Sequence, residues 1–195
     1  MTVANELILA SSSPYRRSLL GRLGLEFRTV SPDIDESPLA DETPRQLVLR
    51  LSAAKAERVA ANTSGALVIA SDQVAELDNI ILTKPGNRDR AREQLRALSG
   101  RAIRFLTGIC VLNTETGRMQ SDCVTMTASF RELAEAEIER YLEREQPWDC
   151  AGAFKSEALG IALLRSMEGP DPTALIGLPL IRLAEMLRQE GLPIP

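Results

Sequence analysis

The chain has 195 residues, a formal net charge of −4 and no histidine. This length suits one domain with a sizeable core, and the acidic balance argues against a nucleic-acid polymer as the main partner. The missing histidine excludes an imidazole base and histidine metal ligands, so any catalysis must use carboxylates, lysines, hydroxyls, thiols or a metal ion held by oxygen atoms.

The first third of the sequence alternates short strands with helices. The apolar run 7–10 predicts a buried strand, and residues 14–23 predict a helix that follows a serine cap and has proline at its first position. We expect a second strand over 27–30, an acidic loop over 31–42 and a helix from 43 to about 61. The strongest buried-strand signal is the run 66–70, which ends in Ser71, Asp72 and Gln73.

The remaining two thirds predict antiparallel strands and further helices. Residues 75–82 predict a hairpin that turns at 78–79, and Asn87 caps a helix that ends at 99–100. Long strands are expected over about 102–112 and 120–130, the second with period-two alternation. A helix over 132–144, strands near 152–156 and 160–165 and a helix over 179–190 follow. This order predicts a mixed α/β fold, a single domain over 1–195 with two lobes around a cleft.

The cysteine pattern and the lengths of the apolar runs predict where in the cell the protein is found. Cys110, Cys123 and Cys150 are widely spaced and odd in number, which predicts free thiols that act as small core residues in a reducing environment. The N-terminus does not resemble a signal peptide, and no run approaches the ~20 apolar residues of a membrane span. We therefore expect a cytoplasmic protein with no membrane partner.

The first candidate site is the turn between the first strand and its helix. Free N–H groups at a helix N-terminus attract an anion, and Ser11, Ser13, Arg16 and Arg17 add donors suited to phosphate. A serine cap followed by solvated arginines gives the same pattern, so both interpretations stay open.

Carboxylates and lysines form the second candidate set. Lys55 lies on the apolar face of its helix, where it must extend to solvent or meet an anion. Asp72 follows a buried strand, where catalytic groups gather in α/β sheets, although a turn role fits equally. Three residues of the acidic loop are candidate oxygen ligands for Mg²⁺ or Mn²⁺: Asp33, Asp35 and Glu36. With Lys84 and the phosphate-ready turn, this set suggests metal-assisted nucleotide hydrolysis without a Walker A motif.

Several motifs in order resemble the Maf (septum-formation-inhibitor-like) nucleotide pyrophosphatases. Residues 7–17 look like the family's opening signature, and the later matches are Asp35-Glu36, Lys55, Ser71-Asp72-Gln73, Thr83-Lys84-Pro85, Thr107-Gly108 and Gly177-Leu178-Pro179. The resemblance covers nearly the whole chain. It implies cleavage of a nucleoside triphosphate between its α and β phosphates with a divalent metal ion, Mg²⁺ or Mn²⁺. It also implies a cytoplasmic enzyme, often a homodimer, with an elongated mixed sheet like that of inosine triphosphate pyrophosphatases.

The resemblance also implies roles for individual residues. Asp72 matches the proposed general base for the attacking water, and Glu36 matches a catalytic carboxylate that, with Asp72, is a candidate metal ligand. Lys55 and Lys84 complete the predicted catalytic set and match phosphate-binding positions. The predicted phosphate ligands are Ser11, Ser13, Arg16 and Arg17.

One branch of the family, which acts on 7-methyl-GTP, matches best. The residues that carry this likeness are Tyr15, Gln73 and Glu157. Methylation at N7 gives guanine a positive charge, which the Glu157 carboxylate can offset and the Tyr15 ring can attract by a cation–π interaction. Two alternatives stay open: the same chemistry on dTTP, UTP or another modified nucleotide, and a nucleotide-binding regulator of cell division with incidental hydrolysis.

Overall fold

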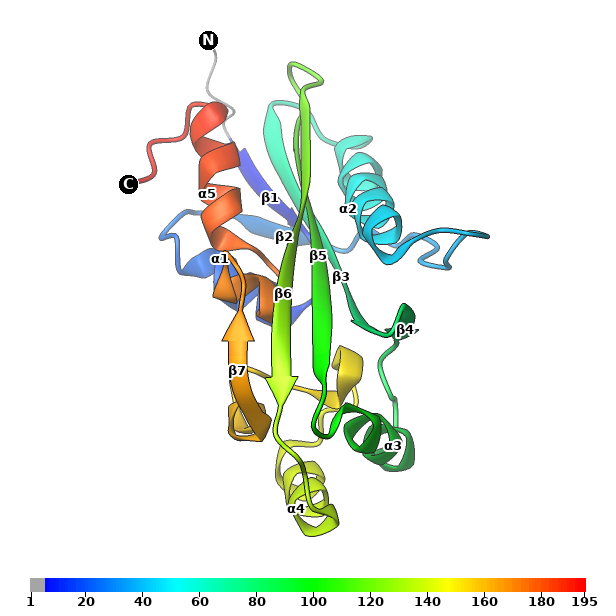
Figure 1. The fold of residues 1–195 in the computed structure, drawn as a ribbon. Helices are drawn as coiled ribbons and strands as arrows, with labels where there is room; N and C mark the ends of the chain where they lie inside the picture. Colours follow the sequence, from blue (N-terminus) through cyan, green and yellow to red (C-terminus); the bar gives the residue numbers. More distant parts are fainter. Residues whose placement is uncertain (1–5) are drawn as a thin grey trace.

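A computed structural model describes residues 6–195, which form a seven-stranded sheet with helices around it (Figure 1). The strands are β1 (Glu6–Ala10), β2 (Arg28–Val30), β3 (Ala66–Leu77), β4 (Ile80–Leu82), β5 (Ala102–Asn113), β6 (Met119–Phe130) and β7 (Leu164–Glu168). The α-helices are α1 (Pro14–Gly21), α2 (Pro44–Ala60), α3 (Arg88–Leu98), α4 (Glu135–Glu145) and α5 (Leu180–Gln189). Three short 3₁₀ helices are η1 (Ala151–Ala153), η2 (Leu159–Leu163) and η3 (Pro172–Ile176).

The sheet is mixed. Its order is β2-β1-β3-β5-β6-β7, with β4 paired to the far end of β3. Strand β1 runs parallel to both β2 and β3. The remaining neighbours are antiparallel: β3 pairs with β5, β5 with β6, and β6 with β7. The expected mixed α/β fold is confirmed.

At one end the sheet is buried on both faces, which gives the first lobe. Leu7 and Leu9 of β1 pack with residues of α1 and α5, while Ile8 and Ala10 pack toward α2. Because successive side chains of a strand point to opposite faces, the continuous apolar run 7–10 supplies both layers.

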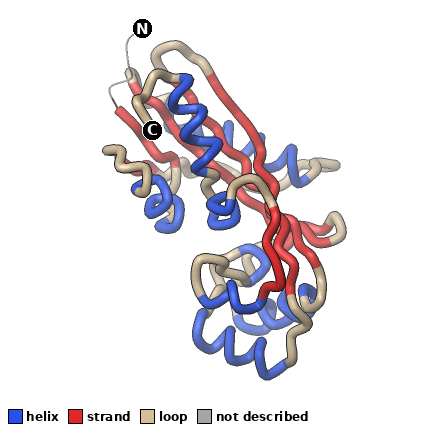
Figure 2. The backbone as a smooth tube through the Cα atoms, turned by 60° about the vertical axis from the view of Figure 1, so that its left-hand side comes forward, coloured by secondary structure: helices blue, strands red, loops and turns tan. Residues whose placement is uncertain are grey.

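The second lobe forms where β5 and β6 continue beyond β1. There α3, α4 and the 3₁₀ helices pack around Phe105, Phe130 and Phe154, whose rings meet at centroid distances of 6.0 and 5.3 Å. Figure 2 shows the long strands running from one lobe into the other. The expected elongated sheet with two lobes is therefore also confirmed.

The prediction of two strands in the second lobe, near 152–156 and 160–165, is wrong. Residues 152–156 contain the end of η1 and a turn, and residues 160–165 are mostly η2, with β7 beginning only at Leu164. Gly152 has a φ of +70°, and a Cβ on Gly160 would lie 2.4 Å from the Lys155 carbonyl oxygen, so both glycines support tight turns. The helix expected over 132–144 begins later, at Glu135.

Strand β3 extends further than expected. The run 66–70 continues to Leu77, so Asp72 lies in mid-strand rather than at the end of a strand. Strand β1 ends at Ala10, one residue after the Leu9–Ile69 pair, and β4 begins to pair only at Ala75. Residues 71–74 of β3 therefore face an opening between β1 and β4.

The cysteines are free thiols. Cys110 and Cys123 are buried as expected, but Cys150 is half-buried and lines a cleft, so its expected place in the core is wrong. Over residues 6–195, no helix has the length and apolar character needed to cross a membrane.

Candidate active site

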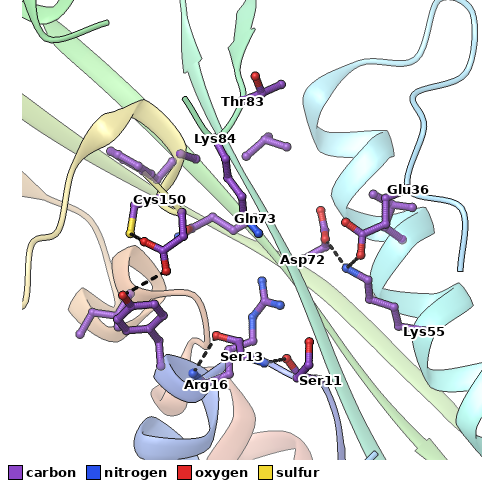
Figure 3. A pocket seen from close by; sticks show the side chains of 18 of the residues that line it. Ser11, Ser13, Arg16, Glu36, Lys55, Asp72, Gln73, Thr83, Lys84 and Cys150 are labelled. Atoms are coloured by element: carbon purple, nitrogen blue, oxygen red, sulfur yellow. Dashed lines mark hydrogen bonds and ion pairs between the residues drawn. The ribbon is translucent and has the colours of Figure 1, made fainter. Parts of the chain in front are cut away.

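A cleft of about 740 Å³ opens beside β3, where residues of both lobes meet (Figure 3). Ten of the predicted site residues line it: Ser11, Ser13, Tyr15, Arg16, Glu36, Lys55, Asp72, Gln73, Lys84 and Glu157. Asp33 lines the cleft as well. Arg17 and Asp35 are exposed and do not line it, because Arg17 lies on the outer face of α1 and the Asp35 carboxylate accepts the Ser37 N–H in its own loop.

One end of the cleft contains a lysine held between two carboxylates. Lys55 Nζ lies 2.6 Å from Asp72 Oδ1 and 2.7 Å from Glu36 Oε1, and Lys55 is only 4% exposed. Of the two interpretations of Lys55, the one in which it meets an anion is correct. The hydrogen bonds described in residues 6–195 use only one oxygen of Asp72, so the other is available to a ligand.

Close packing of α2 on the sheet brings Lys55 to Asp72. Asp72 pairs with Gly108 across β3 and β5, and a Cβ on Gly108 would lie 2.3 Å from the Val48 carbonyl oxygen. Only glycine permits this approach of backbone to backbone. Lys55 follows Val48 by two helical turns, so it lies on the same face of α2 and reaches across to Asp72.

Arg50 of α2 anchors the loop that carries Glu36. Its guanidinium donates to both oxygens of Glu42, at 2.6 and 2.7 Å, and to the Ser37 carbonyl at 3.1 Å. Burial alone would raise the pKa of Glu36, but the hydrogen bond from Lys55 and the charges of Lys55, Lys84 and Arg16 outweigh it, so the pKa is lowered. Glu36 is thus held as an anion beside the cations of the cleft.

The N-terminus of α1 forms the adjoining wall. Ser13 caps the helix by accepting the Arg16 N–H at 3.4 Å, and the Ser11 hydroxyl accepts the Ser13 N–H at 3.1 Å. Both hydroxyls therefore order the turn. Burial lowers the pKa of Arg16, and the charges of Asp72 and Glu36 oppose this effect.

A backbone carbonyl fixes the direction of Arg16. The Gly177 oxygen accepts Arg16 Nε at 2.9 Å and the buried Ser71 hydroxyl at 2.8 Å. Gly177 has a φ of +121°, a conformation that favours glycine. The sequence motifs contain Ser71 and Gly177, but sequence reasoning gave neither a part in the site, because their contact spans 106 residues.

The Gln73 side chain forms its hydrogen bonds on the face of β3 opposite to that of Asp72. Its side-chain nitrogen donates to the carbonyls of Ala174 and Leu175, at 2.7 and 3.1 Å, and to the Thr107 hydroxyl at 3.1 Å. Thr107 also donates to Ala174. The amide nitrogen of Gln73 thus holds η3 against the sheet, so it shapes the cleft wall through that helix.

The other end of the cleft is aromatic and acidic. The Tyr15 hydroxyl donates to Asp149 Oδ2 at 3.3 Å, and Cys150 Sγ donates to Asp149 Oδ1 at 3.4 Å. Glu157 is exposed and lines the same region. Burial, followed by the neighbouring Cys150 and Asp149, raises the pKa of Tyr15. Sequence reasoning missed Asp149, which carries no local motif signal.

The donor set suits a hard divalent cation that is shared with a phosphate ligand. No group of three or more cysteine, aspartate or glutamate side chains gathers as a metal site within residues 6–195. Glu36 and Asp72 nevertheless converge on Lys55, each through one oxygen. Two carboxylates together with phosphate and water oxygens are a usual environment for Mg²⁺, so these residues fit the ion.

The chain is similar to known proteins along nearly its whole length. The chain matches the family described as Maf-like protein over residues 6–190. A protein from Pseudomonas syringae named 7-methyl-GTP pyrophosphatase is 58% identical over 189 residues, which cover 97% of this chain and 98% of that protein. One of the same name from Pseudomonas aeruginosa is 57% identical, with 97% and 99% covered. A crystal structure of a nucleoside-triphosphatase, a dITP/XTP pyrophosphatase from Mycobacterium abscessus, aligns with 94% of this chain and 97% of that one. The two are 16% identical with a TM-score of 0.48, which is too distant to bear on function.

Proposed function

The chain belongs to the Maf family, and on that premise we propose that it hydrolyses a nucleoside triphosphate to the monophosphate and diphosphate. The observation that carries the proposal is the buried Lys55–Asp72 pair, which faces Glu36 and the N-terminus of α1 in one cleft. The names of the relatives at 57–58% identity, which match almost end to end, support 7-methyl-GTP as the substrate.

Cations at one end of the cleft hold the triphosphate. Arg16 and Lys84 line this end, and within residues 6–195 neither forms an ion pair with a carboxylate. The first N–H groups of α1 and the Ser11 hydroxyl add neutral donors. Together they orient the phosphates and offset the negative charge that grows on them during cleavage.

Asp72 receives the proton of the attacking water. Lys55 holds Oδ1 at 2.6 Å, which fixes the carboxylate and leaves Oδ2 without a hydrogen bond among the described residues. Glu36 shares Lys55, so the ammonium group keeps both carboxylates in place around the point of attack. Burial of the Lys55–Asp72 pair on a strand and a helix makes this geometry rigid before substrate binds.

Glu36 and Asp72 would hold a divalent cation, Mg²⁺ or Mn²⁺, together with the phosphates. When bound, such an ion neutralises phosphate charge and polarises the bond that breaks. The chain's own part is to present two carboxylates that Lys55 holds in place, Asp72 buried and Glu36 exposed.

The opposite end of the cleft selects the base. The Tyr15 ring provides a stacking face, and the exposed Glu157 carboxylate favours a base that carries positive charge. Gln73 contributes through η3, which it anchors by two carbonyl hydrogen bonds. We further propose that the chain acts as one domain, since β3, β5 and β6 run through both lobes.

Release of diphosphate from a substrate panel tests this proposal. The panel contains 7-methyl-GTP, GTP, dTTP, UTP, CTP and ITP, each with Mg²⁺ or Mn²⁺, and Asp72→Asn serves as the control for contaminating phosphatases. We expect diphosphate, with 7-methyl-GTP the preferred substrate. Preference for a pyrimidine nucleotide would overturn the proposal that 7-methyl-GTP is the substrate but would leave the proposed cleavage reaction in place. Binding without release from any nucleotide would overturn the chemistry and favour a regulator.

A further inference from the structure

We infer that Asp149 is a specificity-determining residue, a second carboxylate besides Glu157 that offsets the positive charge of an N7-methylated guanine. The inference rests on the proposed function and adds to it a residue from the loop between α4 and η1. It follows from how charge is distributed along the cleft.

The two ends of the cleft differ in their cations: Arg16, Lys55 and Lys84 line the cleft, but its lining residues between 149 and 176 include carboxylates and no lysine or arginine. Lys55 and Glu36 lie on one side of Gln73, and Cys150 lies on the other, as Figure 3 shows. Asp149 contacts Cys150 and therefore lies on the side away from the buried lysine. A triphosphate attracted by Lys84 and the N-terminus of α1 leaves its base at the end that contains Asp149.

The Asp149 carboxylate forms no ion pair within residues 6–195, although its charge contributes to the raised pKa of the nearby Lys155. The nearby cation, Lys155, is paired with Glu145 at 3.4 Å and donates to the carbonyl of the same residue at 3.2 Å. Neither Asp149 nor Glu157 forms an ion pair in the part of the chain that the structure describes. Two carboxylates without a direct ion pair therefore lie at the end of the cleft assigned to the base.

Tyr15 places this charge where a stacked base would meet it. Its hydroxyl donates to Asp149 Oδ2 at 3.3 Å, so the carboxylate lies at the tip of the ring. A cationic base stacked on the ring gains from both the ring face and the carboxylate at its edge, whereas neutral guanine gains mainly the stacking. Asp149 thereby favours binding of 7-methylguanine over unmethylated guanine.

Binding of the two monophosphate products isolates this effect from hydrolysis. The dissociation constants of 7-methyl-GMP and GMP are measured by calorimetry for the wild type, Asp149→Asn and a control, Glu115→Gln. Glu115 is an exposed carboxylate in the β5–β6 turn and does not line the cleft. We expect a wild-type preference for 7-methyl-GMP that falls about tenfold in Asp149→Asn and is unchanged in Glu115→Gln. Asparagine keeps the acceptor for Tyr15, so the change isolates the charge.

Three results would overturn the inference. The first is an unchanged ratio of dissociation constants in Asp149→Asn, and the second is a wild type that shows no preference. The third is an equal loss of preference in Tyr15→Phe, because Asp149 would then act only by holding the ring. Diphosphate release by the wild type and by Asp149→Asn is measured in parallel. Absence of release in the wild type counts against the proposed function, whereas the binding ratio alone decides the role of Asp149.

Discussion

The two ends of the cleft are built differently. At the phosphate end, Lys55 and Asp72 are 4% and 7% exposed and lie 2.6 Å apart on a helix and a strand. At the base end, Asp149 and Glu157 are exposed residues of a loop region, and the contacts of Asp149 are 3.3 and 3.4 Å long. The reacting groups are thus held by buried packing, and the selecting groups by a few exposed contacts.

This difference separates rate from selectivity. A rigid, buried arrangement lowers the cost of ordering the transition state, so its loss should appear in kcat. An exposed carboxylate acts mainly through its charge, so its loss should appear in the ratio between substrates. Changes at the two ends should therefore differ in kind as well as in size.

Asp72→Asn should cause the largest change. Removing a general base typically costs 10²–10⁴-fold, so we expect kcat to fall about a thousandfold. The fold should survive, because asparagine can still accept the hydrogen bond from Lys55, which keeps its pairing with Glu36. Diphosphate release under saturating substrate and thermal melting measure the two quantities. Asp41→Asn, an exposed change outside the cleft, is the matched control. A kcat near that of the wild type would remove Asp72 as the base.

Gly108→Ala should damage the phosphate end without removing any polar side chain. The new Cβ would lie 2.3 Å from the Val48 carbonyl oxygen, a backbone atom, so α2 must move away from the sheet. We expect a loss of about 1–3 kcal/mol in the free energy of unfolding. Because a shift of 1 Å can cost 10²-fold, kcat should fall by up to about a hundredfold.

Gly21→Ala is the control for this prediction, since nothing lies within 4 Å of a Cβ there. Denaturant unfolding and diphosphate release are measured for both variants. Wild-type kcat in a destabilised Gly108→Ala protein would show that the packing of α2 serves stability alone.

The phosphate end could largely be predicted because its signals are local. Ser13 and Pro14 mark the start of α1, and the apolar positions around Lys55 mark the buried face of α2. These patterns depend on neighbours within one or two turns of the chain. The place of Asp72 within β3 was missed, because the polar run Ser71-Asp72-Gln73 looks like the end of a strand although it is paired with β5.

The base end could not be predicted in the same way. The Tyr15–Asp149 contact joins residues 134 positions apart, and no local pattern marks Asp149. The expected strand over 152–156 failed because a short apolar run next to glycines fits a strand and a tight turn equally well. Contacts distant in the sequence therefore define the selecting end, and only the fold reveals them.

Glu157→Gln should change the selectivity, through kcat/KM, and leave kcat with 7-methyl-GTP nearly intact. Loss of its charge should lower kcat/KM for 7-methyl-GTP about tenfold more than for GTP. Steady-state diphosphate release with both nucleotides gives the ratio, and Glu115→Gln is the control. An equal fall in kcat/KM for both nucleotides would mean that Glu157 does not discriminate between a cationic and a neutral base.

Glu42→Gln should have the smallest effect and show how the phosphate end is anchored. The hydrogen bond from Arg50 lowers the pKa of Glu42 from 4.5 to about 2. Its contribution to stability is therefore complete above about pH 4.5 and is lost as the pH falls toward 2. Between pH 7 and pH 3, the wild type should lose about 1–2 °C more in Tm than Glu42→Gln, as thermal melting can measure. Equal losses in both proteins would show that the pair does not stabilise the loop, and Glu36 would then owe its position to Lys55 alone.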